Sequence, residues 1–252
     1  MDIRDLMRPP DIMQARRVLA IQPHYDDNDI GAGGLLALLA ARGAKIDYLT
    51  ITDDLIGVVD ETLSDQEAAA RLRQEQHEAG AIIGVRGQYW LGFPDAGSYD
   101  YFAMRREVIR HIRLLRPEVL VTCDPWLPYE AHNDHILCGR AVAEASYLHG
   151  MKRLKTDPAV DAAYEPYTIK AVVFYHTHAP NTRIDITATR EKKHHAIDCY
   201  RTQFTPEGMT GLHAALDLME RAAADGQPFS HAEAFKVLGD GMLHCNPFTL
   251  NA

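Results

Sequence analysis

The stretch from residue 18 to residue 40 decides the fold. It reads Val18-Leu19-Ala20-Ile21-Gln22-Pro23-His24-Tyr25-Asp26-Asp27-Asn28-Asp29-Ile30-Gly31, followed by Ala32-Gly33-Gly34-Leu35-Leu36-Ala37-Leu38-Leu39-Ala40. The first apolar run is short and rich in branched residues, which is typical of a buried strand, and the second is a helical run that Gly43 closes. An imidazole and three carboxylates stand between the two runs. Ligands bind at the carboxyl ends of strands in open parallel sheets, so this turn is a candidate ligand site.

Charge is dense in this turn, because His24, Asp26, Asp27 and Asp29 fall within six residues. Crowding carboxylates at a strand end is costly unless something positive neutralises them, and one divalent metal ion can serve several of them. A single aspartate could simply cap the next helix. One cap does not explain all four residues together, so the turn predicts a metal site.

Strand and helix patterns alternate along the rest of the chain. Strands are predicted at 45–52, 89–91, 119–123, 169–175 and 183–186, and helices at 64–83, 101–115, 134–148, 189–200 and 212–224. This alternation predicts an α/β fold, a three-layer Rossmann-like arrangement of a mostly parallel sheet with helices on both faces. We expect one domain over 1–252, with a loosely attached lead-in at 1–15 and a C-terminal helical appendage at 206–252.

Composition narrows the classes of partner and compartment. The formal net charge is −9. This charge disfavours nucleic acid or an anionic membrane as the main partner, because both require a basic face. The four cysteines have no CxxC spacing, which suits a reducing compartment. No apolar run is long enough to span a bilayer, and the first twenty residues lack the layout of a signal peptide. We therefore expect a cytoplasmic protein that acts on a small molecule, and a homo-oligomer is compatible with the sequence.

A second group of reactive side chains follows the strand at 119–123. It reads His132-Asn133-Asp134-His135 at the start of a predicted helix, where residues three apart share a face. If this loop and the first turn border one crevice, the chain offers two imidazoles and a carboxylate to one ion, a layout known for catalytic zinc. The chain has 13 histidines, so an HxxH spacing also arises by chance.

Two other interpretations start from the same turn. The glycines after Ile30 loosely resemble a dinucleotide loop, but Leu36 occupies the position that needs a very small residue. Asp27-Asn28-Asp29 resembles the DxD motif of haloacid-dehalogenase-like phosphotransferases, which would use Asp27 and Asp29 with magnesium. That motif expects threonine where this chain has Gly31, and it leaves the histidines unexplained. The phosphotransferase remains the second enzymatic hypothesis.

Together, the two motifs resemble those of the LmbE-like (PIG-L) family of zinc-dependent N-acetylglucosaminyl deacetylases. The first, running from Pro23 to Gly31, matches the family's P/A-H-x-D-D pattern, and the second, from His132 to His135, matches its H-x-D-H pattern. Weaker similarities extend the resemblance over roughly residues 18–205. The resemblance implies a hydrolase that removes an acetyl group from an N-acetylated amino-sugar conjugate.

The resemblance also implies a role for each site residue. His24, Asp27 and His135 would hold Zn²⁺, although other divalent transition metals suit the same ligands. Asp26 would be the general base, and protonated His132 would stabilise the oxyanion. The proton for the leaving amine could come from Asp26 or His132, and the sequence leaves this open.

The remaining roles depend on the surroundings of these residues. By the resemblance, Asp134 would orient one of the histidines. Asp95, Arg73 and Asp53 are expected around the mouth of the site, where sugar hydroxyls need charged hydrogen-bonding partners. Equally, Arg73 could be a solvated charge and Asp95 a turn residue. A non-catalytic sugar-binding protein of the same fold is the alternative from another class, although the presence of both a base and an oxyanion partner argues against it.

The chain departs from the family pattern at two positions. Tyr25 replaces the more common proline, and the acidic residue expected directly after the aspartate pair is Asn28, with Asp29 one place later. These departures bear on the substrate more than on the metal.

Overall fold

A seven-stranded sheet organises residues 8–239 and 241–249, the part of the chain that the computed structural model describes. The strands are β1 (Arg17–Gln22), β2 (Lys45–Thr52), β3 (Val85–Phe93), β4 (Val119–Cys123), β5 (Ala171–Tyr175), β6 (Thr182–Asp185) and β7 (Ala232–Gly239). Their order across the sheet is β3-β2-β1-β4-β5-β7-β6. The first five are mutually parallel, and β7 runs antiparallel to both of its neighbours.

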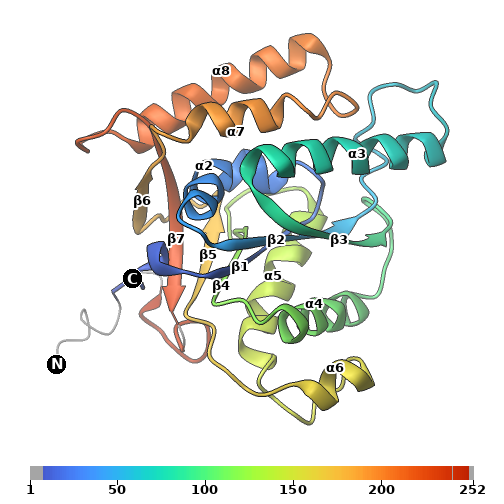
Figure 1. The fold of residues 1–252 in the computed structure, drawn as a ribbon, viewed down its shortest axis with the longest axis vertical. Coiled ribbons are helices and arrows are strands. Elements are labelled where there is room, and N and C mark those ends of the chain that lie inside the picture. Colours follow the sequence, from blue (N-terminus) through green and yellow to red (C-terminus); the bar gives the residue numbers. More distant parts are fainter. Residues whose placement is uncertain (1–7, 240, 250–252) are drawn as a thin grey trace.

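Helices cover both faces of this sheet (Figure 1). One layer holds α2 (Asp27–Ala41), α3 (Asp65–Ile83), α7 (Arg190–Ile197) and α8 (Pro206–Ala223), and the other holds α4 (Tyr101–Leu115), α5 (Asn133–Leu148) and α6 (Pro158–Ala163). The predicted three-layer α/β fold with a mostly parallel sheet is therefore confirmed. Within the described residues, no helix is both long enough and apolar enough to cross a membrane.

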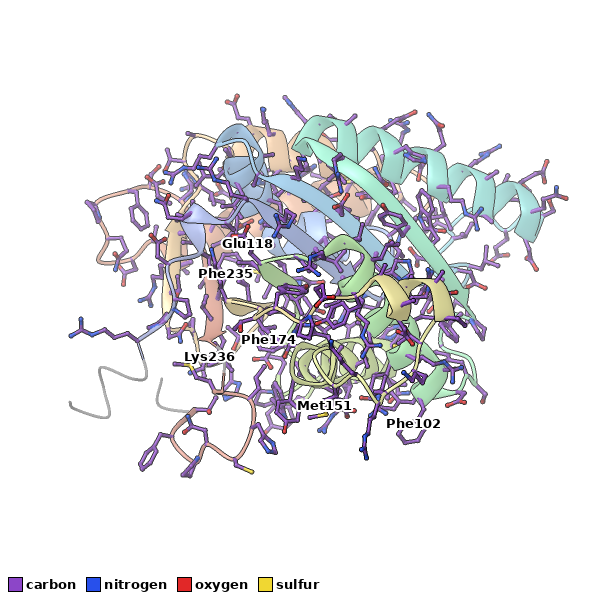
Figure 2. All side chains as sticks on the ribbon, turned by 60° about the horizontal axis from the view of Figure 1, so that its bottom comes forward. Phe102, Glu118, Met151, Phe174, Phe235 and Lys236 are labelled. Carbon is purple, nitrogen blue, oxygen red and sulfur yellow. The ribbon has the colours of Figure 1, made fainter. Side chains whose placement is uncertain are left out.

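Burial explains why the inner strands were recognisable. All residues of β4 and β5 are buried, as are those of β1 after Arg17, because helices cover both faces of a parallel sheet. Figure 2 shows side chains filling the space around the sheet and the α4–α5–α6 layer, where Phe174 of β5 is buried. β3 lies at the sheet edge and is mostly half-buried. It is longer than the predicted 89–91 because Arg86, Gly87 and Gln88 on one side and Gly92 on the other interrupt the apolar pattern.

Helix ends follow local capping chemistry. Ser64 and Glu67 form the predicted capping box, and Gly84, which has a φ of 100°, is the C-cap of α3. α8 begins at Pro206 rather than at 212, because Thr205 caps it and proline fits the first helical position. The short α6 lies in a segment where no element was predicted.

The described parts of the two terminal segments are integrated into the core and the sheet. Residues 1–7 of the expected lead-in lie outside the described residues, but Ile12 sits in a short 3₁₀ helix, η1 (Ile12–Gln14), and is buried in the core. The segment 206–252, which was expected to be a helical appendage, contains the helix α8 but also the strand β7. β7 lies inside the sheet between β5 and β6, and it buries charged Glu233 and Lys236, which concealed its strand character.

The glycine run in α2 allows close packing. A Cβ atom at Gly31 would lie 2.3 Å from Cδ2 of Tyr175, and one at Gly34 would lie 2.6 Å from Cγ2 of Ile186. These glycines are part of the helix rather than of a phosphate-binding loop. They let α2 approach β5 and the segment after β6.

A buried ion network joins α2 to three elements from the last part of the chain, α7, α8 and β7. Lys193 of α7 is buried, and its Nζ lies 3.0 Å from Oε1 of Glu220 on α8 and 2.9 Å from Oε1 of Glu233 on β7. The Glu233 carboxylate in turn accepts the backbone N–H groups of Gly34 and Leu35 in α2. The network therefore holds four elements together through one ammonium group.

Replacing Lys193 should destabilise the protein, because two buried carboxylates would lose their shared cation. Since Glu220 also pairs with Arg190, we expect K193M to lose about 3 kcal/mol of unfolding free energy in urea titrations. The exposed neighbour Lys192 supplies the control, K192M, which should stay close to wild type. Equal stability of the two variants would contradict the prediction.

Glu220 should also make stability depend on acid. Burial would raise its pKa, but the hydrogen bond from His194 and the charge of Lys193 lower it to about 2, compared with 4.5 for the free side chain. The unfolded chain therefore binds this proton first, and up to about 3 kcal/mol of stability is lost as the pH falls through this interval. The difference in stability between wild type and E220Q should shrink between about pH 6 and about pH 3, and a constant difference would contradict this.

Candidate active site

The reactive side chains gather where the strand order reverses. β1 has β2 on one side and β4 on the other, and the helices that follow these strands begin at the same edge. His24 lies in the turn after β1, and Asp27 is the first residue of α2. His132 occupies the N-cap position of α5, and His135 lies in its first turn. Crevices of this kind are the usual ligand sites of open α/β sheets.

Asp27 contacts two histidines from different parts of the chain. Its Oδ2 lies 3.2 Å from Nδ1 of His24, and its Oδ1 lies 3.4 Å from Nε2 of His135. One potential ligand atom from each residue lies within 4.8 Å of the other two. Two imidazoles and a carboxylate at this spacing can hold one metal ion, which fits the donor set of a transition-metal site.

A second set of potential ligands shares His24. Its Nε2 lies 3.1 Å from Oδ1 of Asp95 and 3.8 Å from Oδ2 of Asp134, and His132 is close enough to complete the set. The Asp134 oxygens already accept hydrogen bonds from the Ala96 N–H and the Tyr99 hydroxyl. We therefore regard Asp95 and Asp134 as partners that orient His24 from behind, an arrangement common around metal-binding histidines.

Electrostatics couple these groups. Burial would raise the pKa of Asp27, but the charge of His135 and the hydrogen bond from His24 hold it well below its usual range. Burial would likewise lower the pKa of His24, yet hydrogen bonds to Asp134, Asp27 and Asp95 raise it. The carboxylates around His24 therefore favour a positive charge next to them, and a bound metal cation would supply that charge in place of a proton.

Asp26 is buried beside Asp27 and makes no capping hydrogen bond with its side chain, although it occupies the N-cap position of α2. Burial and the negative charge of Asp27 raise the pKa of Asp26 to about 7. A carboxylate of this kind can accept and release a proton near neutral pH.

His132 faces both of the other histidines. Its ring centroid lies 4.5 Å from that of His24 and 5.1 Å from that of His135. Its Nδ1 is buried and has no hydrogen-bond partner among the described residues. Burial and the two neighbouring imidazoles lower the pKa of His132, which favours its neutral form rather than the protonated form that the sequence analysis expected.

The structure places the three expected mouth residues differently. Asp95 is buried against His24. Oδ1 of Asp53 accepts the backbone N–H of Asp95, so Asp53 holds the loop that carries Asp95. Arg73 is exposed on α3, with its guanidinium 5.7 Å from the Trp90 ring centroid. Burial raises the pKa of Tyr25, and the hydrogen bond and charge of Arg73 offset only part of this rise. Substrate contacts by these residues remain predictions.

Two carboxylates at the site were missed. Asp54 is buried, has a φ of 57°, and accepts the Tyr25 N–H at 3.0 Å. Its position directly after β2, beside β1, was a usable signal. Glu130 accepts the His132 N–H and lies near His135. It stands in a loop without periodicity, and no spacing rule singles it out.

Asp29 does not belong to the cluster. It is fully buried, and its two oxygens accept hydrogen bonds from the hydroxyls of Tyr48, at 2.6 Å, and Tyr200, at 2.5 Å. Its carboxylate is thus occupied within the protein and does not form a pair with Asp27.

Comparison with known proteins fits this geometry. The sequence profile of the PIG-L family, described as GlcNAc-PI de-N-acetylase, matches residues 19–146, which include both motifs. The chain belongs to the PIG-L family. It is 34% identical over 235 residues to the diacetylchitobiose deacetylase of Thermococcus kodakarensis, covering 92% of this chain and 87% of the relative. It is 30% identical over 230 residues to a 1D-myo-inositol 2-acetamido-2-deoxy-alpha-D-glucopyranoside deacetylase of Saccharomonospora viridis, covering 75% of this chain and 85% of the relative.

A solved structure also resembles almost the whole chain. The N,N'-diacetylchitobiose deacetylase from Pyrococcus horikoshii, in complex with its inhibitor MPG, has a TM-score of 0.90 and 30% identity. The match covers 99% of this chain and 96% of that protein. The predictions of the family, and of an amide-cleaving hydrolase of the deacetylase type, are therefore confirmed.

Metal binding should distinguish the two ligand sets. We expect protein freed of metal by a chelator to take up one zinc ion, measured by competition with a chromogenic chelator. Residues that only hold a metal ligand in place typically change metal affinity by about 10- to 100-fold when mutated. H135A should weaken zinc binding by more than this, because it removes a ligand, whereas H132A should still bind zinc. The reverse result would favour the set that contains Asp95 and Asp134.

Proposed function

We propose that this PIG-L family member is a zinc-dependent N-deacetylase that releases acetate from a small substrate containing N-acetylglucosamine. The observation that carries the proposal is the contact of His24 and His135 with the two oxygens of Asp27, with Asp26 adjacent in sequence and the His132 ring centroid 4.5 Å from that of His24. Two histidines and one carboxylate form a known ligand set for catalytic zinc.

Zinc would be held by His24, Asp27 and His135. When bound, the ion polarises the amide carbonyl and makes a water molecule acidic enough to attack near neutral pH. Other divalent transition metals accept the same nitrogen and oxygen donors, and the choice among them is part of the proposal.

Asp26 is the proposed general base. It lies next to a ligand, is assigned to neither ligand set, and has a pKa raised to about 7 by burial and by Asp27. It can therefore take a proton from the attacking water and, once protonated, return it to the leaving amine. This division of work suits a neutral His132, which keeps a single ring N–H for a hydrogen bond to the developing oxyanion.

The substrate class is supported by what the relatives are named for. The names of the Thermococcus and Saccharomonospora proteins share an N-acetylated amino sugar, joined to different partners. We extend only this shared group to the present chain. Asp95, Arg73 and Asp53 stay proposed for the surroundings of the sugar, with exposed Arg73 as the direct contact and Asp95 and Asp53 acting through the loop that they hold.

The phosphotransferase hypothesis has no support in the site. It needs Asp27 and Asp29 to share a magnesium ion, but both oxygens of Asp29 are bound by tyrosine hydroxyls.

A cytoplasmic location is part of our proposal, since the four cysteines are free and three of them are buried.

Activity of an Asp26 variant tests the proposal. Purified zinc-loaded protein should release primary amine from N-acetylglucosamine, diacetylchitobiose or the acetylated glucosaminyl-inositol. D26N should lower kcat by about 10²- to 10⁴-fold, because it removes the base, while zinc content stays unchanged. The exposed Asp225 supplies the matched control, D225N, which should behave as wild type.

Two results would contradict the proposal. Full activity of D26N would remove Asp26 as the base. Magnesium-dependent release of phosphate, with no amine released from any of the three sugars, would return the site to the phosphotransferase hypothesis.

A further inference from the structure

The loop between β4 and α5 is held by its own hydrogen bonds. Oδ1 of Asp124 accepts the Trp126 N–H, the Asp124 carbonyl accepts the Leu127 N–H, and the Leu127 carbonyl accepts the Glu130 N–H. Tyr129 has a φ of 67°, an uncommon conformation for a residue other than glycine, and its side chain is fully exposed. This sharp turn brings Glu130 to the start of α5.

One carboxylate then reaches both histidines of the second motif. Oε1 of Glu130 accepts the His132 N–H at 2.8 Å, and Oε2 lies 3.4 Å from Nδ1 of His135. The Glu130 side chain is only 20% exposed, which limits competition from water.

The two ring nitrogens of His135 therefore face two different carboxylates. Nδ1 faces Glu130, and Nε2 faces Oδ1 of Asp27. A proton held on Nδ1 by a carboxylate leaves the lone pair on Nε2, which is the nitrogen directed at the proposed metal position.

We propose that Glu130 is a positioning residue that fixes the orientation and tautomer of His135 for metal binding, and this inference rests on the proposed function. His24 has its own rear carboxylates, Asp95 and Asp134, so Glu130 supplies the equivalent partner for the other imidazole. Each proposed histidine ligand is thus held between the metal position and a carboxylate.

A purely structural role for Glu130 has a different signature. A carboxylate near a helix N-terminus stabilises the helix whether or not it touches His135. Such a role would change the Tm of the metal-free protein and leave zinc affinity unchanged.

Three variants separate reach, charge and surface effects. E130Q keeps the size of the side chain and an oxygen for the His132 N–H, but it loses the negative charge facing His135. E130D keeps the charge near the helix but is shorter by one methylene group, so it should not span both contacts. Glu61 is exposed, and E61Q serves as the control for loss of a surface charge.

The primary measurement is zinc affinity by chelator competition, together with Tm without metal and kcat and KM with zinc in excess. We expect E130Q and E130D to bind zinc about 10- to 100-fold more weakly than wild type, with a lower kcat and a nearly unchanged KM. The Tm of both metal-free variants should stay close to that of E61Q.

The outcomes separate this inference from the function on which it rests. Zinc affinity of E130Q and E130D equal to that of a zinc-binding wild type would overturn the positioning role and leave the proposed function intact. A drop in Tm with unchanged zinc affinity would assign Glu130 to the helix alone, which also overturns the inference. A wild-type protein that binds no zinc would overturn both.

Discussion

The contact of one carboxylate with two imidazoles is the constraint on which the site depends. Asp27 begins α2, directly after the turn that carries His24, while His135 arrives from a helix more than a hundred residues later in the chain. The parallel pairing of β1 with β4 brings these segments to one edge of the sheet. The inner strands, the glycine packing of α2 and the buried network around Lys193 all fix where α2 begins, and hence where Asp27 lies.

The sequence predicted the parts of the fold in which local chemistry and burial agree. β2, α4 and β4 form with their predicted bounds, and α3 starts at its capping box. Dense charge at two strand ends likewise predicted which loops meet. These signals are local or periodic, so a single sequence contains them. The family resemblance supplied roles that spacing alone left open.

Other features depend on contacts between distant segments. β7 escaped notice because Glu233 and Lys236 are charged yet buried, and the ammonium group that pairs with Glu233 lies on α7. Asp29 looked equivalent to Asp26 and Asp27 in sequence, but only the fold shows that two tyrosines from β2 and from the segment after α7 occupy it. Glu130 has no distinguishing pattern, and its importance follows from where a turn directs it.

The position of β7 has a consequence for the order in which the molecule can assemble. β6 precedes β7 in the chain, yet among the residues that the structure describes it pairs only with β7, which also covers the free edge of β5. During synthesis, both β5 and β6 must therefore wait with unpaired backbone groups until the segment ending at Gly239 has left the ribosome. Because Glu233 lies on this strand, the helix that carries Asp27 receives the contact of Gly34 with Glu233 only after β7 has been synthesised.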